Sequence, residues 1–377
     1  MVAKFFRAAA YNSGWSTFQN DLIYVTDRIV SLEVTERFTR LGEFTLTLPF
    51  SDDVISAFMR NGIINGTIFV DNSWLWVQSI AYDNSTVVLA GKDCKGMLST
   101  RLTEYGEAQQ SAAQGYDIAE GTTKECIEHY VTRNALSPEN TDRILPIVSV
   151  AGVNGISSDS YMSHLEVLSD VVEKLCVDAD IGYTVRGRLQ SSQSSGFVLT
   201  TVKGVDRSHA QSERPRVIFA ASHGNVSSIS FEHGVDDLVN AIYATDTNEL
   251  TSIVHRDTVP ASGLLRRECS ISSGIPYDTT TEDYYDRYVL NEVADNTESH
   301  SFSLTVPVQG YGTGYSLGDY VSVLDDSTKN LERLQITEVR KSYASGQRSI
   351  GITLGVPKQK PFQRLNNDLI SGTARRR

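Results

Sequence analysis

The sequence predicts a mainly β protein with an α/β insert, and three observations support this fold class. Apolar and polar residues alternate with a period of two in residues 29–104 and again in 226–357, which is the pattern of half-buried strands. Gly, Asn and Asp turn signals separate these alternations. Residues 105–225 instead contain two segments with helical spacing. We therefore predict a first β domain at 1–104, an α/β insert at 105–225, a second β domain at 226–357 and a basic tail at 358–377.

The first β region is predicted to contain five strands and one short helix. Ser51 stands where a helix N-cap is expected, and Asp52 and Asp53 follow it in the first turn, where carboxylates interact favourably with the helix dipole. The helix is predicted at 51–60, and the strands at 29–38, 43–50, 66–71, 74–82 and 86–93.

The insert is predicted to contain two capped helices and a hairpin. Thr122 with Glu125 has the spacing of a capping box, in which each side chain bonds the backbone N–H of the other residue. Ser163 with Glu166 has the same spacing. We expect helices at 122–135 and 163–176, and a β-hairpin made by 181–189 and 196–206.

The second β region repeats the alternating pattern and contains one helix candidate at 280–296. Tyr284, Tyr285 and Tyr288 fall on one side of this candidate, which is typical of a core or interface face, with stacking on sugars as the alternative. The strands are predicted at 226–234, 238–247, 264–272, 300–308, 318–326, 331–343 and 347–355.

The two β regions end in the same order of parts, which indicates an internal repeat. Each has a Gly turn that opens a strand, an acidic turn, a strand with a Gln, and a hairpin to a last strand that contains a Gly. The matched residues are Gly66 with Gly318, Asp71 with Asp325 and Asp326, Gln78 with Gln335, and Gly91 with Gly355.

The composition excludes some classes of function. With 34 basic and 46 acidic residues, the formal charge of −12 argues against a surface built to bind phosphate backbones.

The four cysteines are far apart in sequence and form no C-x-x-C motif, so we expect reduced, structural thiols at Cys94, Cys126, Cys176 and Cys269. Neither a secretory signal nor an apolar run of about 18 residues is present, so no membrane span is predicted.

Several carboxylates are candidates for acid–base chemistry. Asp319 follows the Gly318 turn, and Asp325 and Asp326 fall in a hairpin loop. Loop carboxylates are usually turn formers, and we favour this interpretation over catalysis. Asp206 is next to Arg207 after a predicted strand, where a local ion pair is a simpler expectation than a catalytic acid. The sequence contains no H-E-x-x-H, G-x-S-x-G, P-loop or EF-hand spacing.

Histidines and tryptophans offer two further candidate sites. His223 and His233 lie ten residues apart, close to Asp236 and Asp237, and are candidate metal ligands. We favour turn and edge-strand histidines, because no supporting pattern accompanies them. The tryptophans Trp15, Trp74 and Trp76 are candidates for stacking on sugars, and Trp74 and Trp76 share one strand face, which suits a binding strip or barrel packing.

The basic tail has no obvious core face. It is a candidate for contact with nucleic acid, but a tail that is disordered or docks on a partner is the simpler interpretation. Its charged residues are Lys358, Lys360, Arg364, Arg375, Arg376 and Arg377, against Asp368.

Four stretches in their order along the chain resemble the tail hub proteins of long-tailed bacteriophages. They are IVSLEVTERFTRLGEFTLTLP at 29–49, LAGKDCKGMLSTRL at 89–102, VKGVDRS at 202–208 and SLGDYVSV at 316–323. The resemblance covers residues 20–357 loosely and extends to the N-terminal part of tail-associated lysins, contractile baseplate hubs and type VI spike bases.

The resemblance implies two similar β-barrels per chain and a homotrimer, whose six barrels adapt the six-fold tail tube to a three-fold tip and let DNA pass. It implies a virion protein of the tail tip, made in the host cytoplasm, with no catalytic, cofactor or metal site and no membrane in the mature virion. The implied partners are the distal tail protein, the tail tube protein, the tape measure protein and, through the tail, a spike, fibre or lysin.

The sequence departs from many such hubs because only about twenty residues follow its last predicted strand. We therefore expect any lytic or receptor-binding role to belong to another protein. Two alternatives to a structural hub stay open: a carbohydrate-binding module and a cell-wall hydrolase component. If the hub interpretation holds, part of the −12 charge is expected to line the channel and repel passing DNA.

Overall fold

The computed structural model describes most of the chain, in two compact units. The described residues are 1–7, 10–12, 17–104, 117–190, 193–246, 248–257, 259–272, 285–286, 289–290, 292–293, 296–326 and 328–356. Unit 1 comprises Met1–Ser228 with Leu304–Ile352, and unit 2 comprises Ile229–Ser303 with the residues from Thr353 onward. This division does not follow the four predicted segments one for one, so their boundaries stay predictions. The mainly β fold class with an α/β insert is confirmed.

The first β region of unit 1 is a continuous antiparallel arrangement in the strand order β3, β1, β6, β7, β8, β5, β4. All five predicted strands are present, and β1 and β3 are additional strands from the N-terminal residues, for which no strand was predicted. The bounds are β1 (Ala3–Phe6), β2 (Ala10–Asn12), β3 (Thr17–Thr26), β4 (Ser31–Arg37), β5 (Glu43–Pro49), β6 (Thr67–Val70), β7 (Ser73–Tyr82) and β8 (Thr86–Asp93).

Helix α1 (Asp52–Asn61) covers the core of these strands and has the predicted cap. The Ser51 hydroxyl accepts a hydrogen bond from the Val54 N–H at 3.3 Å. The helix ends at Gly62, whose φ of 70° is the left-handed conformation that favours glycine. Val54 and Phe58 are buried, and Phe58 packs against Phe5 of β1 with ring centroids 4.9 Å apart.

The first half of strand β7, residues 73–77, is buried on both faces and separates two hydrophobic cores. Leu75 and Val77 face the core shared with β4, β5, β8 and α1. Trp74 and Trp76 belong to the core of the α/β insert, where Trp74 packs edge-on against Phe197 at 5.5 Å. Since Trp74 and Trp76 are only 6% and 8% exposed, they form no sugar-binding strip on the surface, and the packing alternative holds with the insert as the partner. Trp15 lies outside the described residues.

The insert contains the predicted first helix and hairpin. Thr122 and Glu125 make the complete capping box of α2. Its Cys126 and Tyr130 are fully buried. Strand β13 pairs antiparallel with β12 and parallel with β10. The bounds are β9 (Asp117–Thr122), α2 (Thr123–Val131), η2 (Thr132–Leu136), η3 (Thr141–Arg143), β10 (Ile147–Gly152), β11 (Ser157–Ser163), α3 (Leu168–Asp178), β12 (Gly182–Gln190) and β13 (Gln193–Val202).

The second predicted capping box is wrong, because α3 begins at Leu168 and Ser163 is the last residue of β11. The Ser163 hydroxyl is 2.6 Å from the hydroxyl of Thr103, and both groups are buried. The Glu166 carboxylate accepts from Lys174 at 2.6 Å. Leu165 has a φ of 53°, which is incompatible with a right-handed helix. A long-range hydroxyl pair therefore replaces the local box.

The last strands of the chain form a second antiparallel meander in unit 1. β20 pairs with β21, and β21 with β22, just as β6, β7 and β8 follow one another in the first region. The order of parts in the predicted repeat is thus present in both meanders, while barrel closure stays a prediction. The bounds are β14 (Ile218–Phe219), η4 (Ala221–His223), β19 (Ser299–Val306), β20 (Tyr320–Asp325), β21 (Asn330–Ala344) and β22 (Gln347–Val356).

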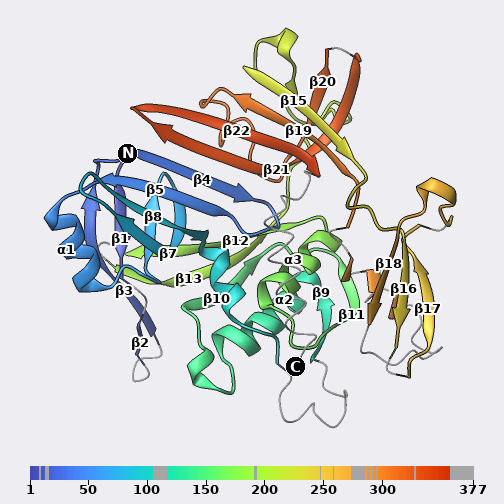
Figure 1. Ribbon diagram of the computed structural model, residues 1–377, viewed down its shortest axis with the longest axis horizontal. Coiled ribbons are helices and arrows are strands. Elements are labelled where there is room, and N and C mark those ends of the chain that lie inside the picture. Colours follow the sequence, from blue (N-terminus) through green and yellow to red (C-terminus); the bar gives the residue numbers. More distant parts are fainter. Residues whose placement is uncertain are drawn as a thin grey trace. The chain divides into compact units, whose positions relative to one another are not determined.

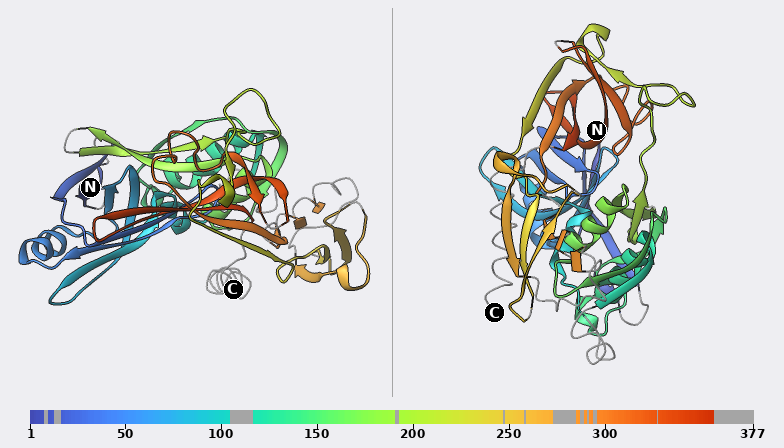
Figure 2. Two further views of the ribbon diagram at one scale, coloured as in Figure 1. Left: turned by 90° about the horizontal axis from the view of Figure 1, so that it is seen from above. Right: turned by 90° about the vertical axis from the view of Figure 1, so that its right-hand side faces the viewer.

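Unit 2 contains a three-stranded sheet in which β16 pairs antiparallel with β17 and parallel with β18; these strands stay together in both views of Figure 2. Its elements are β15 (Ser228–Gly234), β16 (Ala241–Thr245), β17 (Thr251–His255), η5 (Gly263–Leu265) and β18 (Glu268–Ser272). Strand β17 was not predicted. Most of the helix candidate at 280–296, with Tyr284 and Tyr288, lies outside the described residues; Tyr285 is buried.

Among the described residues, no helix combines the length and the apolar character that crossing a membrane requires. The predicted basic tail at 358–377 lies outside the described residues.

The two-sided burial of β7 leads to a first prediction. Trp74→Ala should lower the free energy of unfolding by about 3–5 kcal/mol, because it leaves a large cavity in the core of the insert. Chemical denaturation monitored by circular dichroism measures this change. Met59→Ala on α1 is the control, because Met59 is 59% exposed and should change stability by less than about 0.5 kcal/mol. Equal stability of the two variants would contradict the assigned packing.

Candidate functional site

The site with the most converging contacts is the seam where β4 pairs with β21 (Figure 1). Residues 31–37 pair antiparallel with residues 338–344, so the seam joins segments about 300 residues apart. Charged side chains reinforce it. Arg37 Nε donates to Glu338 at 2.7 Å, and Lys341 Nζ donates to Glu36 at 2.8 Å. The backbone ladder and these ion pairs connect the first strands of the chain to its last meander.

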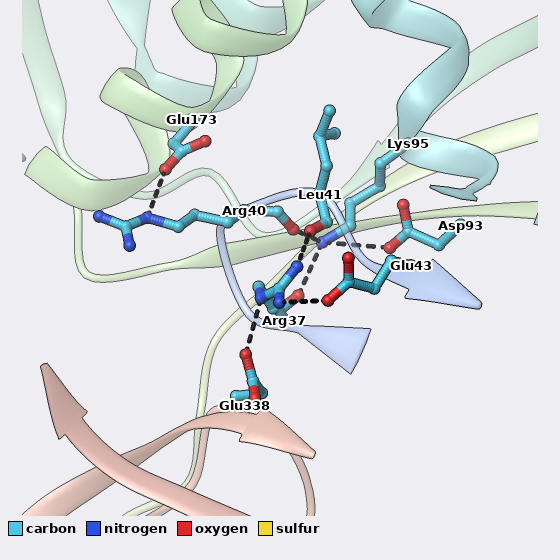
Figure 3. Close-up of polar contacts among 8 residues, drawn as sticks. All are labelled: Arg37, Arg40, Leu41, Glu43, Asp93, Lys95, Glu173 and Glu338. Carbon is cyan, nitrogen blue, oxygen red and sulfur yellow. Dashed lines mark hydrogen bonds and ion pairs between the residues drawn. The ribbon is translucent and has the colours of Figure 1, made fainter. Parts of the chain in front are cut away.

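Arg37 ends β4 and has three partners (Figure 3). Besides Glu338, its guanidinium donates to Glu43 at 3.0 Å and to the carbonyl oxygen of Leu41 at 2.7 Å. The Arg37 side chain is only 10% exposed, so these bonds lie in a region of low dielectric, where charge-assisted hydrogen bonds are strong. Arg37 thus ties the loop between β4 and β5, residues 38–42, to β21.

Lys95 also binds the 38–42 loop, through backbone carbonyl oxygens (Figure 3). Its side chain is 3% exposed, and its ammonium donates to the carbonyl oxygens of Arg37, at 2.6 Å, and of Arg40. The Asp93 carboxylate lies 3.5 Å from the Lys95 ammonium. Burial raises the pKa of Asp93, and the Lys95 charge opposes this rise. Lys95 therefore satisfies loop carbonyls and keeps Asp93 paired.

Phe38 of the 38–42 loop packs closely against two glycines, Gly182 of the insert and Gly318 before β20. A Cβ atom added to Gly182 would lie 2.4 Å from the Phe38 ring, and one added to Gly318 would lie 2.2 Å from it. Only glycine at both places admits the ring. The Phe38 N–H donates to Thr337 at 3.0 Å, and its carbonyl oxygen accepts from Tyr183 at 3.2 Å. The loop therefore contacts the insert and the last meander at one residue.

A salt bridge between Arg40 and Glu173 connects the 38–42 loop to the insert. Arg40 Nε donates to Glu173 of α3 at 3.2 Å, as Figure 3 shows. The three parts of unit 1 thus meet at the 38–42 loop. The charged groups around this loop are paired with each other and with backbone groups.

Glu36 forms a second polar centre on the seam. Its carboxylate accepts from the Ser73 hydroxyl at 2.6 Å as well as from Lys341. Burial alone would raise the pKa of Glu36, but the Lys341 charge and the hydrogen bonds from Lys341 and Ser73 hold that pKa below its usual value. Glu36 therefore connects β4, β21 and β7 as a carboxylate.

The candidate acids predicted in the second β region accept hydrogen bonds from groups in neighbouring turns and strands. Asp319 is 4% exposed, and it accepts from the N–H groups of Val205 and Ser316 at 2.8 and 3.0 Å and from Arg207 Nε at 3.0 Å. Asp325 accepts from the Thr328 hydroxyl. Such contacts orient turns, as predicted for turn formers.

Asp326 also binds a backbone group. It accepts from the Ser222 N–H at 2.9 Å, and this bond is the main reason why its pKa is lowered.

The expected local pair of Asp206 with Arg207 is wrong. Asp206 accepts from Arg333 of β21 at 2.9 Å, and Arg207 pairs with Asp319 of the β20 turn. Adjacent residues on extended backbone point in opposite directions, which explains why each finds a distant partner. The two crossed pairs fix the segment after β13 onto the last meander.

The predicted thiols are free, as expected. Cys94, Cys126 and Cys176 are buried and unpaired with one another, and Cys269 is partly buried. Burial raises the pKa of Cys126 to about 11, so this thiol is inert at neutral pH.

His223 and His233, the candidate metal ligands, do not belong to a larger ligand cluster in the part of the chain that the structure describes. Within the described residues, no group of three or more His, Cys, Asp or Glu residues is placed to hold a metal ion. His223 lies in η4, and His233 of β15 contacts His300.

No pattern in the sequence identifies the most connected residues, Arg37 and Lys95. Both lie in stretches quoted above for the family resemblance, but a lone basic residue carries no sign of burial. Their partners Glu338 and Asp93 are equally ordinary in sequence.

Three solved structures share this fold. They are a tail protein from Neisseria meningitidis MC58 (TM-score 0.55, 11% identity, 94% of this chain and 96% of that chain), prophage tail protein gp18 from Listeria monocytogenes EGD-e (0.51, 10%, 98% and 98%) and the 43 kDa tail protein of prophage MuSo2 from Shewanella oneidensis (0.50, 12%, 94% and 98%). A search of curated proteins finds no match. The fold is therefore that of phage tail proteins.

A family model then identifies the family. The model described as Siphovirus ReqiPepy6 Gp37-like protein matches residues 17–356. Since this match spans most of the chain, the protein belongs to that siphovirus family. The predicted resemblance to phage tail proteins is confirmed.

The Lys95 contacts lead to a second prediction. Lys95→Met should lower the free energy of unfolding by about 3–5 kcal/mol, because it removes the cation beside the Asp93 carboxylate and the donor to the carbonyl oxygens of Arg37 and Arg40. Adding Asp93→Asn should recover part of this loss. Lys329→Met is the control, since the Lys329 side chain is 76% exposed and its loss should change little. Denaturant titration of the four proteins is the measurement, and a loss below about 1 kcal/mol for Lys95→Met would rule out the assigned role.

The lowered pKa of Glu36 leads to a third prediction. Its carboxylate contributes stability above the usual pKa of 4.5, and this contribution is lost as the pH falls through the lower folded-state pKa. We expect Glu36→Gln to cost about 1.5–3 kcal/mol at neutral pH, with a difference from the wild type that shrinks between about pH 6 and pH 3.

Glu33→Gln on the same strand is the control. Its ion pair with Arg340 is about half exposed on both sides and should contribute about 0–1 kcal/mol. Unfolding curves at several pH values compare the variants, and a gap for Glu36→Gln that is independent of pH would count against the ionised carboxylate.

Proposed function

We propose that this protein is the structural hub of the tail tip, a homotrimer that adapts the six-fold tail tube to a three-fold tip and lets DNA pass. The observation that carries the proposal is the membership of residues 17–356 in a siphovirus family, together with two similar antiparallel meanders in one chain. A chain that presents one motif twice matches six-fold symmetry when three copies form a ring.

The rigid junction of unit 1 supports this role. A ring that transmits load from the tube to the tip needs its two repeats held in one geometry within each chain. The β4–β21 seam, the Arg37 contacts and the Lys95 contacts supply that connection through buried, paired charges. Under the proposal, strands of both meanders would also pair or pack between neighbouring copies and so remove exposed sheet edges.

The proposed partners follow from the place in the virion. They are the distal tail protein and the tail tube on one side, the tape measure protein in the channel, and a tip spike, fibre or lysin that docks on residues 358–377. We also propose that part of the formal charge of −12 faces the channel, where like charge prevents DNA from adhering.

A non-enzymatic role is part of the proposal. The carboxylates Asp319, Asp325 and Asp326 each accept hydrogen bonds that fix turns, which suits scaffolding better than proton transfer. The carbohydrate-binding alternative loses its main support, because Trp74 and Trp76 are buried.

Light scattering on the full chain tests the proposal. We expect a species of three times the 41.6 kDa chain mass, either alone or at rising concentration, and a complex of three chains with six copies of the distal tail protein when the two are mixed. A complex with any other ratio, or none at micromolar concentrations, would overturn the trimeric hub. Release of sugars or peptides from purified host cell wall by the same sample would instead favour the hydrolase alternative.

A further inference from the structure

A cluster of aromatic and imidazole rings lies on β15 and β19 in unit 2. Phe231 packs on Phe302 with ring centroids 4.8 Å apart, and His233 lies opposite His300 with centroids 5.7 Å apart. The partners run in opposite order along the two strands, so each is a cross-strand pair of antiparallel neighbours (Figure 1). His233 is exposed and His300 is partly exposed.

The two imidazoles face each other through the same ring nitrogen. The Nδ1 atoms of His233 and His300 are 3.4 Å apart, which is longer than an ordinary N–H···N hydrogen bond. Two nitrogens bound to one tetrahedral zinc ion at 2.0–2.1 Å are ~3.4 Å apart. The ring planes are nearly perpendicular, at 87°, so the two rings do not stack on each other and are in contact through their Nδ1 atoms.

We propose that His233 and His300 form a two-histidine site for a divalent late transition-metal ion, with zinc as the probe. Neutral imidazole is a preferred ligand of such ions. Each Nδ1 would bind through its lone pair while Nε2 carries the proton, and water would complete the coordination, since the pair is open to solvent. The site cross-links β15 to β19.

Packing around the pair favours the binding geometry. Phe231 contacts the His300 ring edge-on at 5.2 Å and the His233 ring at 6.4 Å. These contacts restrict the imidazoles before the metal arrives, which lowers the entropy lost on binding. Glu232 projects from the opposite face of β15, because side chains alternate along a strand, so the site contains histidine nitrogens and no carboxylate from that residue.

Calorimetric titration of the metal-free full chain with zinc at about pH 7.5 tests the proposal. We expect one ion per chain and a rise in melting temperature when zinc is added, because a ligand of the folded state stabilises it. His233→Ala and His300→Ala should each weaken zinc binding at least tenfold and abolish the rise. Added cobalt should show visible absorption bands that are shifted and intensified relative to free aqueous cobalt, and both variants should lack this change.

His223→Ala is the matched control and should bind zinc as the wild type does. Because the substituted side chains are partly or fully exposed, circular dichroism should show all variants folded. Absence of zinc binding by the wild type, or equal binding by the wild type and the two variants of the pair, would overturn the proposal. Loss of binding in His223→Ala alone would assign the ion to another site and also overturn it.

Discussion

Unit 1 depends on one constraint, the pairing of β4 with β21. This ladder brings residues 31–37 and 338–344 together and places Arg37, next to the 38–42 loop, beside Glu338. The buried ammonium of Lys95 then holds the loop carbonyls, and the Phe38 ring reaches both the insert and the last meander. Loss of the ladder would leave buried charges without partners, so the junction forms as a whole or not at all.

The second organising feature is the burial of residues 73–77 of β7 on both faces. One face packs into the core with α1, and the other presents Trp74 and Trp76 to the insert. The first β region and the insert therefore share β7, and neither has a complete hydrophobic core without this strand. Apolar contact therefore holds an insert with a different secondary structure on the β scaffold, in addition to the salt bridge from Arg40 and the pairing of β13 with β3.

Local patterns predicted the elements well, and long-range contacts account for what they missed. Alternation revealed β4 and β5, and the Thr122 capping box revealed the start of α2. The Ser163 box failed because Thr103, sixty residues away, competes for the same hydroxyl. Asp206 and Lys95 illustrate the same limit, since their partners are set by how strands pair, and a single sequence contains no signal for that pairing. The family resemblance supplied the class of protein, which neither composition nor periodicity contains.

The separation of the two seam strands has a consequence for synthesis on the ribosome. Arg37 and Glu338 are 301 residues apart, and translation at ~5–20 residues per second would deliver the second strand roughly 15–60 s after the first. During that interval β4 has an unsatisfied edge in the nascent chain, which invites pairing with other chains. The pairing of β4 with β21 can therefore form only after β21 has been synthesised. A prematurely terminated chain would lack β21, and the edge of its β4 would stay unpaired and prone to aggregation.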